Sequence, residues 1–261
     1  MIHRPPVLVL VLGLLLGACT SSEPAGDVSP KDTGAEAEVD VGDPIAEGEE
    51  EPEPERLLPD GVDMVAEPRE RYTPMFEAPG TKTADFALDT RNINGELSPM
   101  LIVGATRRDG EPWYEVLLPL RPNGSTAWVR ERDVKLRERT ERIEVDLSER
   151  ALEYLVDGEV AVRFKVGIGT DQFPTTTGDF YVYVKVPYEN PSQPYGIMAL
   201  GLSGFSRVIT DWPGGGRIAV HGTPYASDRG EAVSHGCVRV YNEDMESLLD
   251  VPLGTPVVIS K

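Results

Sequence analysis

The pattern of hydrophobic and polar positions predicts a mainly β chain from about residue 62 onward. Residues 143–147 alternate with period two, which is typical of a strand that buries one face. Apolar runs flank Asp157-Gly158, a dipeptide that favours the tight turn of a hairpin, and Asp109-Gly110 and Asn123-Gly124 offer further turns. The other strands that we expect span residues 100–103, 113–118, 126–129, 152–156, 160–166, 180–186, 218–220 and 256–259.

One short helix is expected near the C-terminus. Asn242 is suited to cap its first turn, and Met245, Leu248 and Leu249 give it an apolar face before Pro252. The sequence contains no internal repeat, no glycine-rich loop for phosphate and no dinucleotide fingerprint. We therefore expect no cofactor.

The acidic charge of the chain is concentrated in one segment. The formal net charge is −19, and residues 23–60 hold 14 acidic and 2 basic side chains together with six prolines. Because no aromatic residue precedes Tyr72, this part of the chain has too little apolar surface to offset its conformational entropy. We expect residues 20–61 to form a disordered acidic linker. So acidic a chain is repelled by phosphate backbones, which argues against a nucleic-acid partner.

The first residues indicate export. A basic start leads into the apolar run 7–16, which is too short for a permanent membrane span of about 20 residues. The small pair Gly17-Ala18 and then Cys19 follow. Residues 1–19 resemble a bacterial lipoprotein signal peptide, which implies that Cys19 becomes the lipidated N-terminus. The alternative is an ordinary secretory signal with a chance cysteine.

Two folded segments are predicted after the linker, residues 62–138 and 139–261. In the first, residues 113–116 and 128–129 resemble strands of bacterial Src-homology-3-like (SH3-like) domains, although Ala127 stands where glycine is common. This resemblance implies a small β-barrel. Such a domain would either bind cell wall or peptides, or serve as a spacer.

Candidate chemistry is concentrated around Cys237. It is the one thiol expected in the mature chain, and the two histidines expected there, His221 and His235, both lie close to it in sequence. Imidazole can take a proton from a thiol near neutral pH, and Gly236 allows a backbone angle at which amide groups converge on an oxyanion. The alternatives are an inert core cysteine and a zinc site. One thiol and two imidazoles give zinc only three ligands, so we expect no metal.

These residues resemble a known enzyme motif. His221-Gly222, followed by residues 234–239 with the sequence Ser-His-Gly-Cys-Val-Arg, is similar to the motif of L,D-transpeptidases, whose YkuD-type catalytic domain acts in bacterial cell-wall synthesis. The likeness covers about residues 143–259 and implies a β-sandwich with a short helix. It extends to Pro174-Thr175-Thr176-Thr177-Gly178, Tyr195-Gly196, Ala199-Leu200 and residues 252–257, with Thr176 and Pro224 departing from the common proline and asparagine.

The resemblance implies a role for each residue of the motif. Cys237 is the nucleophile, His221 is its base, and the Gly222 carbonyl orients the imidazole. The backbone amides of His235, Gly236 and Cys237 form the oxyanion hole.

Three further residues are expected to bind substrate through the same resemblance. They are Ser234, Tyr195 and Arg239, and Arg239 either supports the loop or pairs with a substrate carboxylate.

The implied reaction is acyl transfer through a thioester. Family substrates are peptidoglycan tetrapeptide stems, which lose their terminal D-alanine and are cross-linked by the side-chain amine of a second stem. The alternatives are a carboxypeptidase, in which water replaces the amine, and a wall-binding lipoprotein without turnover. We expect a monomer that is lipid-anchored in the bacterial envelope and faces the periplasm or cell wall, with the choice of membrane and of acceptor left open.

Overall fold

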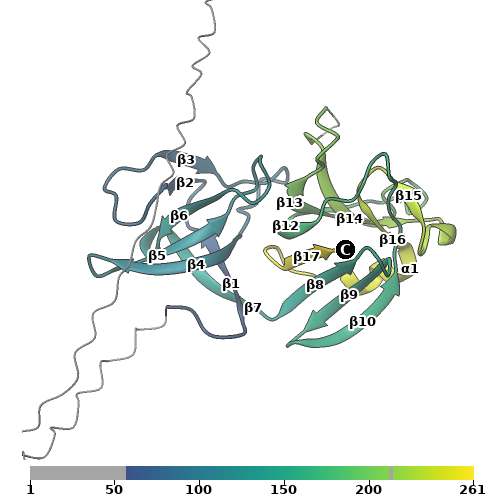
Figure 1. Ribbon diagram of the computed structural model, residues 1–261, viewed down its shortest axis with the longest axis horizontal. Coiled ribbons are helices and arrows are strands. Elements are labelled where there is room, and N and C mark those ends of the chain that lie inside the picture. Colours follow the sequence, from purple (N-terminus) through teal and green to yellow (C-terminus); the bar gives the residue numbers. More distant parts are fainter. Residues whose placement is uncertain (1–56, 212–213) are drawn as a thin grey trace, which may run out of the picture. The chain divides into compact units, whose positions relative to one another are not determined.

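The computed structural model describes residues 57–211 and 214–261 (Figure 1). The predicted signal peptide, its lipidation site Cys19 and nearly all of the predicted linker lie outside the described residues. The described residues all belong to one compact unit. Among the described residues, no helix has the length and apolar character to cross a membrane.

A five-stranded antiparallel sheet comes first along the chain. Its strand order is β6-β5-β4-β1-β7. The strands are β1 (Asp63–Pro68), β4 (Met100–Arg108), β5 (Glu111–Leu117), β6 (Thr126–Arg130) and β7 (Val134–Arg139). The 3₁₀ turn η1 (Glu131–Asp133) joins the last two, and β2 (Tyr72–Met75) pairs with β3 (Phe86–Asp89) as a separate ribbon. No finding tests whether this part is SH3-like, so that remains a prediction.

An eight-stranded sheet follows, in the order β10-β9-β8-β17-β12-β13-β14-β16. Its strands are β8 (Glu141–Asp146), β9 (Ala151–Val156), β10 (Glu159–Lys165), β12 (Gly178–Pro187), β13 (Met198–Phe205), β14 (Arg217–Thr223), β16 (Val238–Tyr241) and β17 (Pro256–Ser260). One apolar core draws residues from both ends of this order, including Leu152 of β9 and Val240 of β16. The two halves of the sheet therefore curve around a shared core (Figure 1).

Short elements complete the second sheet. They are β11 (Ile168–Gly169) with its parallel partner β15 (Ala232–Ser234), the turn η2 (Ala226–Asp228), the helix α1 (Asn242–Met245) and the turn η3 (Glu246–Leu248). The prediction of a mainly β chain with one short helix is confirmed.

The predicted hairpins are confirmed at two turns. Both residues of Asp109-Gly110 and of Asp157-Gly158 have positive φ, at 51° and 79° and at 52° and 78°, and each pair connects adjacent antiparallel strands.

The prediction that Asn242 caps the helix is wrong. Tyr241 is the N-cap residue and makes no side-chain capping bond, while Asn242 is the first helical residue. The Asn242 amide instead accepts a hydrogen bond from the Ile197 N–H at 3.3 Å and donates one to the Pro191 carbonyl at 2.9 Å. Asn242 thus fixes the chain that leads into β13.

The two sheets share packed side chains. Tyr181 of β12 is fully buried within the apolar core of the five-stranded sheet. The Ser98 hydroxyl donates to the Tyr183 carbonyl at 2.7 Å, and Arg142 of β8 pairs with Asp63 of β1 at 2.7 Å. These contacts tie the second sheet to the first.

Candidate active site

His221 is placed in the middle of the second sheet. It lies on β14 between β13 and β16, and only 4% of the residue is exposed. Its Nδ1 atom is 2.7 Å from the carbonyl oxygen of Gly222. Because a carbonyl can only accept, Nδ1 carries the proton and Nε2 is left as the basic nitrogen.

The environment of His221 keeps the imidazole neutral. Burial lowers its pKa from 6.5 to about 4, since a buried imidazolium loses its hydration, and the bond to Gly222 offsets only part of this effect. The side chain is therefore an unprotonated base at neutral pH.

Cys237 lies directly before β16, next to the strand that carries His221. The parallel register pairs Val220 with Val238, so Cys237 stands beside Ala219, whose backbone amide hydrogen-bonds to the thiol. Burial nevertheless raises the pKa of the thiol, because it disfavours the thiolate more than the amide favours it. Cys237 and His221 line one cavity of about 480 Å³.

The loop before Cys237 is held by Ser234. Its buried hydroxyl donates to the Cys237 carbonyl at 2.6 Å and accepts from the Gly236 N–H at 3.0 Å. Gly236 has a φ of 115°, the unusual backbone angle that the sequence predicts there. The Gly236 amide is engaged by Ser234, so in this arrangement it is not a donor to a substrate oxygen. Ser234 lines the cavity, but both of these bonds stay within the loop.

Arg239 lies beside the site on the strand that follows. Its Nη1 atom is 3.2 Å from Oδ2 of Asp228, a buried carboxylate that also accepts a 2.8 Å hydrogen bond from the Thr223 hydroxyl. Arg239 also lines the cavity, and its Nε atom is buried without a hydrogen-bond partner in the described part of the chain. These contacts join Arg239 to η2, and its two predicted roles, support of the loop and binding of a substrate carboxylate, stay predictions.

An aromatic wall lies against the base. The Tyr195 ring is 5.0 Å from the His221 ring at an interplanar angle of 66°, and Tyr188 stacks on Tyr195 at 5.7 Å and 15°. Both tyrosines line the cavity. The sequence motif includes Tyr195, whereas no periodicity or motif marks Tyr188.

His235 is exposed and its ring lies 4.8 Å from that of Phe173. It therefore shares the loop with Cys237, while its side chain packs on a neighbouring turn. No group of three His, Cys, Asp or Glu side chains within residues 57–211 and 214–261 is arranged to hold a metal ion.

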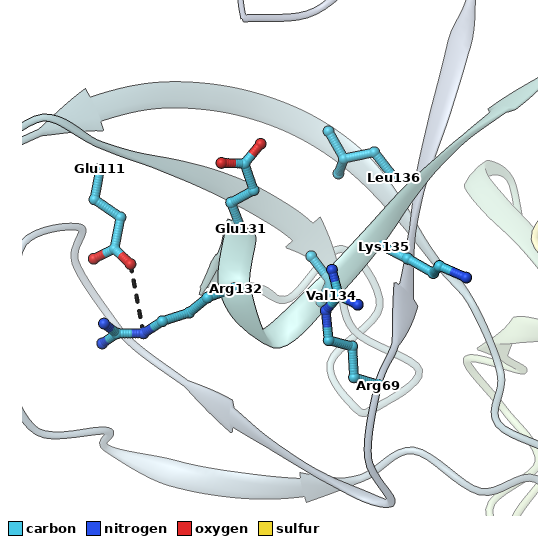
Figure 2. A pocket seen from close by; sticks show the side chains of 7 residues that line it. All are labelled: Arg69, Glu111, Glu131, Arg132, Val134, Lys135 and Leu136. Atoms are coloured by element: carbon cyan, nitrogen blue, oxygen red, sulfur yellow. Dashed lines mark ion pairs between the residues drawn. The ribbon is translucent and has the colours of Figure 1, made fainter.

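A second cavity lies on the five-stranded sheet (Figure 2). It has a volume of about 510 Å³ and is lined by Arg69, Glu111, Glu131, Arg132, Val134, Lys135 and Leu136. Figure 2 shows an Arg132–Glu111 ion pair, 3.5 Å long, at one side of it. This cavity contains neither a thiol nor an imidazole, so the reactive chemistry belongs to the cavity around Cys237.

Comparisons with known proteins show what the second half of the chain is similar to. Residues 140–259 match the family model of the YkuD L,D-transpeptidase catalytic domain. The chain is 30% identical over 120 residues to a Bacillus subtilis (strain 168) protein that carries the name L,D-transpeptidase YkuD, and 32% identical to its Bacillus licheniformis namesake. Each alignment covers 46% of this chain and 65% of the relative, so the chain spans less than two thirds of these proteins.

One solved structure is also similar to part of the chain. The L,D-transpeptidase from Xylanimonas cellulosilytica DSM 15894 is 28% identical, with 46% of this chain and 60% of that chain covered and a TM-score of 0.35. By the family model, residues 140–259 are similar to the YkuD L,D-transpeptidase catalytic domain.

Proposed function

We propose that this protein cross-links peptidoglycan tetrapeptide stems through a thioester on Cys237. The observation that carries the proposal is the bond from His221 Nδ1 to the Gly222 carbonyl, in a cavity that also holds the thiol. This bond fixes the tautomer in which Nε2 can accept a proton. A base held in this way, lining the same cavity as a cysteine, is the arrangement that nucleophilic acyl transfer requires.

The first half-reaction forms the acyl-enzyme. Nε2 of His221 takes the thiol proton while Sγ of Cys237 attacks the carbonyl carbon of the third stem residue. The resulting oxyanion is stabilised by backbone amides of the loop, including that of Cys237. The tetrahedral intermediate then expels the amine of the terminal D-alanine, which receives the proton from His221. A thioester and free D-alanine result.

The second half-reaction makes the cross-link. The side-chain amine of another stem attacks the thioester and gives a proton to His221, and Sγ leaves and recovers that proton. One amide is broken and one is made, so the exchange needs no external energy source. The neutral resting state of both groups fits this scheme, because the proton moves as the bond forms.

We further propose that the catalytic domain works in the bacterial envelope, held to a membrane by a lipid on Cys19. The acidic, proline-rich residues 20–61 would then serve as the tether. The mass of the mature N-terminus tests this: a lipidated Cys19 supports the proposal, and an unmodified N-terminus elsewhere rejects it.

Mass spectrometry of purified disaccharide-tetrapeptide tests the reaction. After incubation with the full chain, we expect a cross-linked dimer that lacks one alanine, and no such product with the Cys237→Ala variant. Tripeptide monomer alone would indicate a carboxypeptidase. Unchanged substrate, together with a Cys237 that forms no adduct with a carbapenem such as ertapenem, would reject the proposal.

A further inference from the structure

One wall of the active-site cavity includes residues from the segments 206–211 and 214–216, which lie between β13 and β14. Ser206, Ile209 and Gly216 line the cavity here, followed by Arg217 and Ile218 of β14. The regular pairing of the two strands is interrupted between Gly201 and Phe205. Past that irregularity, Phe205 still pairs with Arg217 and the Ser206 N–H donates to the Gly216 carbonyl at 2.8 Å. The carbonyls of Ser206, Ile209 and Gly215 need donors from elsewhere in the chain.

Arg121 of the N-terminal half supplies these partners. Its Nη1 atom donates to the Ser206 carbonyl at 2.9 Å, and its Nη2 atom donates to the carbonyls of Ile209 at 3.1 Å and Gly215 at 2.9 Å. One guanidinium therefore joins three points of the wall. A planar group with several fixed donors suits this task, whereas an ammonium group lacks the fork.

Phe205, the last residue of β13 before the wall, is held by Asn123, two residues after Arg121. The Asn123 side chain donates to the Phe205 carbonyl at 2.8 Å and accepts from the Phe205 N–H at 2.9 Å, as a neighbouring strand would. The Arg121 guanidinium also lies 4.7 Å from the centre of the Phe205 ring. Phe205 is thus held by both backbone and ring.

A second arginine, Arg217 of β14, makes a contact in the opposite direction, from the second sheet to the 119–123 loop. Arg217 donates to the Leu202 carbonyl at 2.7 Å and to the Pro119 carbonyl at 3.4 Å, and it stacks on Phe205 at 4.5 Å. Contacts between the 119–123 loop and the cavity wall therefore run in both directions.

We propose that Arg121, which lies outside the matched catalytic domain, is a positioning residue for the substrate pocket of that domain. The inference rests on the proposed function for its kinetic test. Through Arg121, the N-terminal half contributes to substrate binding by fixing the shape of the cavity wall. The imidazole lies on β14 and the thiol directly before β16, and the three wall carbonyls that Arg121 binds belong to neither strand.

The test compares three variants of the full chain, Arg121→Ala, Arg121→Lys and Arg137→Ala. Arg137 is the matched control, because it is an arginine of the same half whose exposed ion pair with Glu67 lies on β7 and β1. For each, we would measure kcat and KM for disaccharide-tetrapeptide, the rate of Cys237 alkylation by iodoacetamide, and hydrogen exchange in peptides that contain Ser206 and Gly216.

We expect Arg121→Ala to lower kcat/KM by roughly 10- to 100-fold, mainly through KM, because a displaced wall misplaces the bound stem. Alkylation of Cys237 should stay within about 2-fold, and exchange in the wall should accelerate at least about 10-fold. Arg121→Lys should recover part of the loss, and Arg137→Ala should match the wild type.

Unchanged kcat/KM and unchanged exchange in Arg121→Ala would overturn the inference. An equal fall in alkylation and in kcat/KM would also overturn it, since it would show general disruption of the fold. A wild-type protein that does not process the stem would reject the proposed function alone, because the exchange measurement still decides whether Arg121 holds the wall.

Discussion

His221 is oriented by a backbone carbonyl rather than by a carboxylate, and this choice affects its charge. A carboxylate would stabilise the imidazolium and raise the pKa, whereas the Gly222 carbonyl is neutral and leaves burial as the larger influence. Both members of the Cys237–His221 pair are therefore uncharged before substrate binds. In the proposed reaction, catalysis then depends on proton transfer during attack, not on a thiolate formed in advance.

This charge state predicts the pH dependence of acylation. We expect the rate of Cys237 acylation by ertapenem to stay nearly constant from about pH 5.5 to about pH 8. It should decline at lower pH with a midpoint near 4, the pKa of His221, because the protonated ring cannot accept the thiol proton. Mass spectrometry of the adduct at a series of pH values measures this, and an acid midpoint at pH 6 or above would contradict it.

The same buried imidazole predicts a loss of stability in acid. In the unfolded chain His221 takes up a proton below pH 6.5, while in the folded chain it does so only near pH 4, so the unfolded state binds more protons between these values. The contribution of the neutral His221 to the free energy of unfolding is fully present above pH 6.5 and is lost as the pH falls towards 4. Between pH 7 and pH 4 it amounts to about 3 kcal/mol.

Urea denaturation of the wild type and of His221→Gln checks this value. Glutamine does not titrate. The free energy of unfolding of the His221→Gln variant should therefore fall by about 3 kcal/mol less than that of the wild type between pH 7 and pH 4. Parallel decreases in the two proteins would show that His221 is protonated in the folded state as readily as in the unfolded state.

At the residue level, the sequence predicts what chemistry and motif spacing reveal. Cys237, His221 and the backbone angle of Gly236 follow from the motif around the thiol. The engagement of the Gly236 amide by Ser234 does not, because it depends on the side-chain rotamer of Ser234. The contact of Arg121 with the cavity wall is not predictable from the sequence either, because Arg121 lies 85 residues from Ser206 and meets it only in the tertiary fold.

At the level of elements, β14 receives its geometry from a close approach of the chain before β13. Gly196 has a φ of 60°, and a Cβ there would collide with the Gly222 backbone and with Oδ1 of Asn242. Gly222 carries the carbonyl that orients His221. The absence of a side chain at Gly196 is thus part of the support of the base.

A Gly196→Ala variant should therefore lose activity as well as stability. We expect acylation by ertapenem to slow by more than about 10-fold, because displacement of Gly222 moves the imidazole. Gly158→Ala is the matched control: its φ is 78°, no atom lies within 4 Å of its added Cβ, and it sits in a distant hairpin. That control should lose about 1 kcal/mol of stability and keep its acylation rate. Equal acylation rates in both variants would contradict the role given to Gly196.

Elements with a clear period were predictable, and those without one were not. The alternation in β8 and the turn residues of the β9–β10 hairpin are visible in the sequence. All eight residues of β13 are buried, so this strand has no polar face to reveal it. The edge strand β7 has the reverse problem: most of its residues are charged and exposed, so too few apolar positions remain to show an alternation.

On the scale of the whole molecule, the two sheets are joined by buried contacts. Arg139 donates to the Leu253 carbonyl at 3.1 and 3.0 Å. A Cβ at Gly254 would lie only 3.0 Å from Pro99, directly before β4, and 3.1 Å from Val65 of β1, so the chain passes close to the first sheet there. Together with the burial of Tyr181 in the first core, these contacts make each sheet part of the other's environment. The sequence shows two patterned segments but not this interface, because its members are far apart along the chain.

This interface predicts that the two sheets unfold together. Trp113 and Trp128, two of the three tryptophans, report on the first sheet through their emission, and Cys237 reports on the second. A short pulse of thiol reagent at neutral pH labels the unfolded chain in preference to the native one, because burial raises the pKa of the Cys237 thiol. We expect the two probes to give one urea midpoint.

The Ser98→Ala variant makes this comparison decisive. It removes the hydroxyl that donates to the Tyr183 carbonyl between the sheets and leaves that carbonyl without this donor, so it should destabilise by about 1 kcal/mol. If the sheets are one cooperative unit, both midpoints fall by the same amount. Two separate midpoints in the wild type would instead mean that each sheet folds by itself, and the wall held by Arg121 would then be a contact between independent domains.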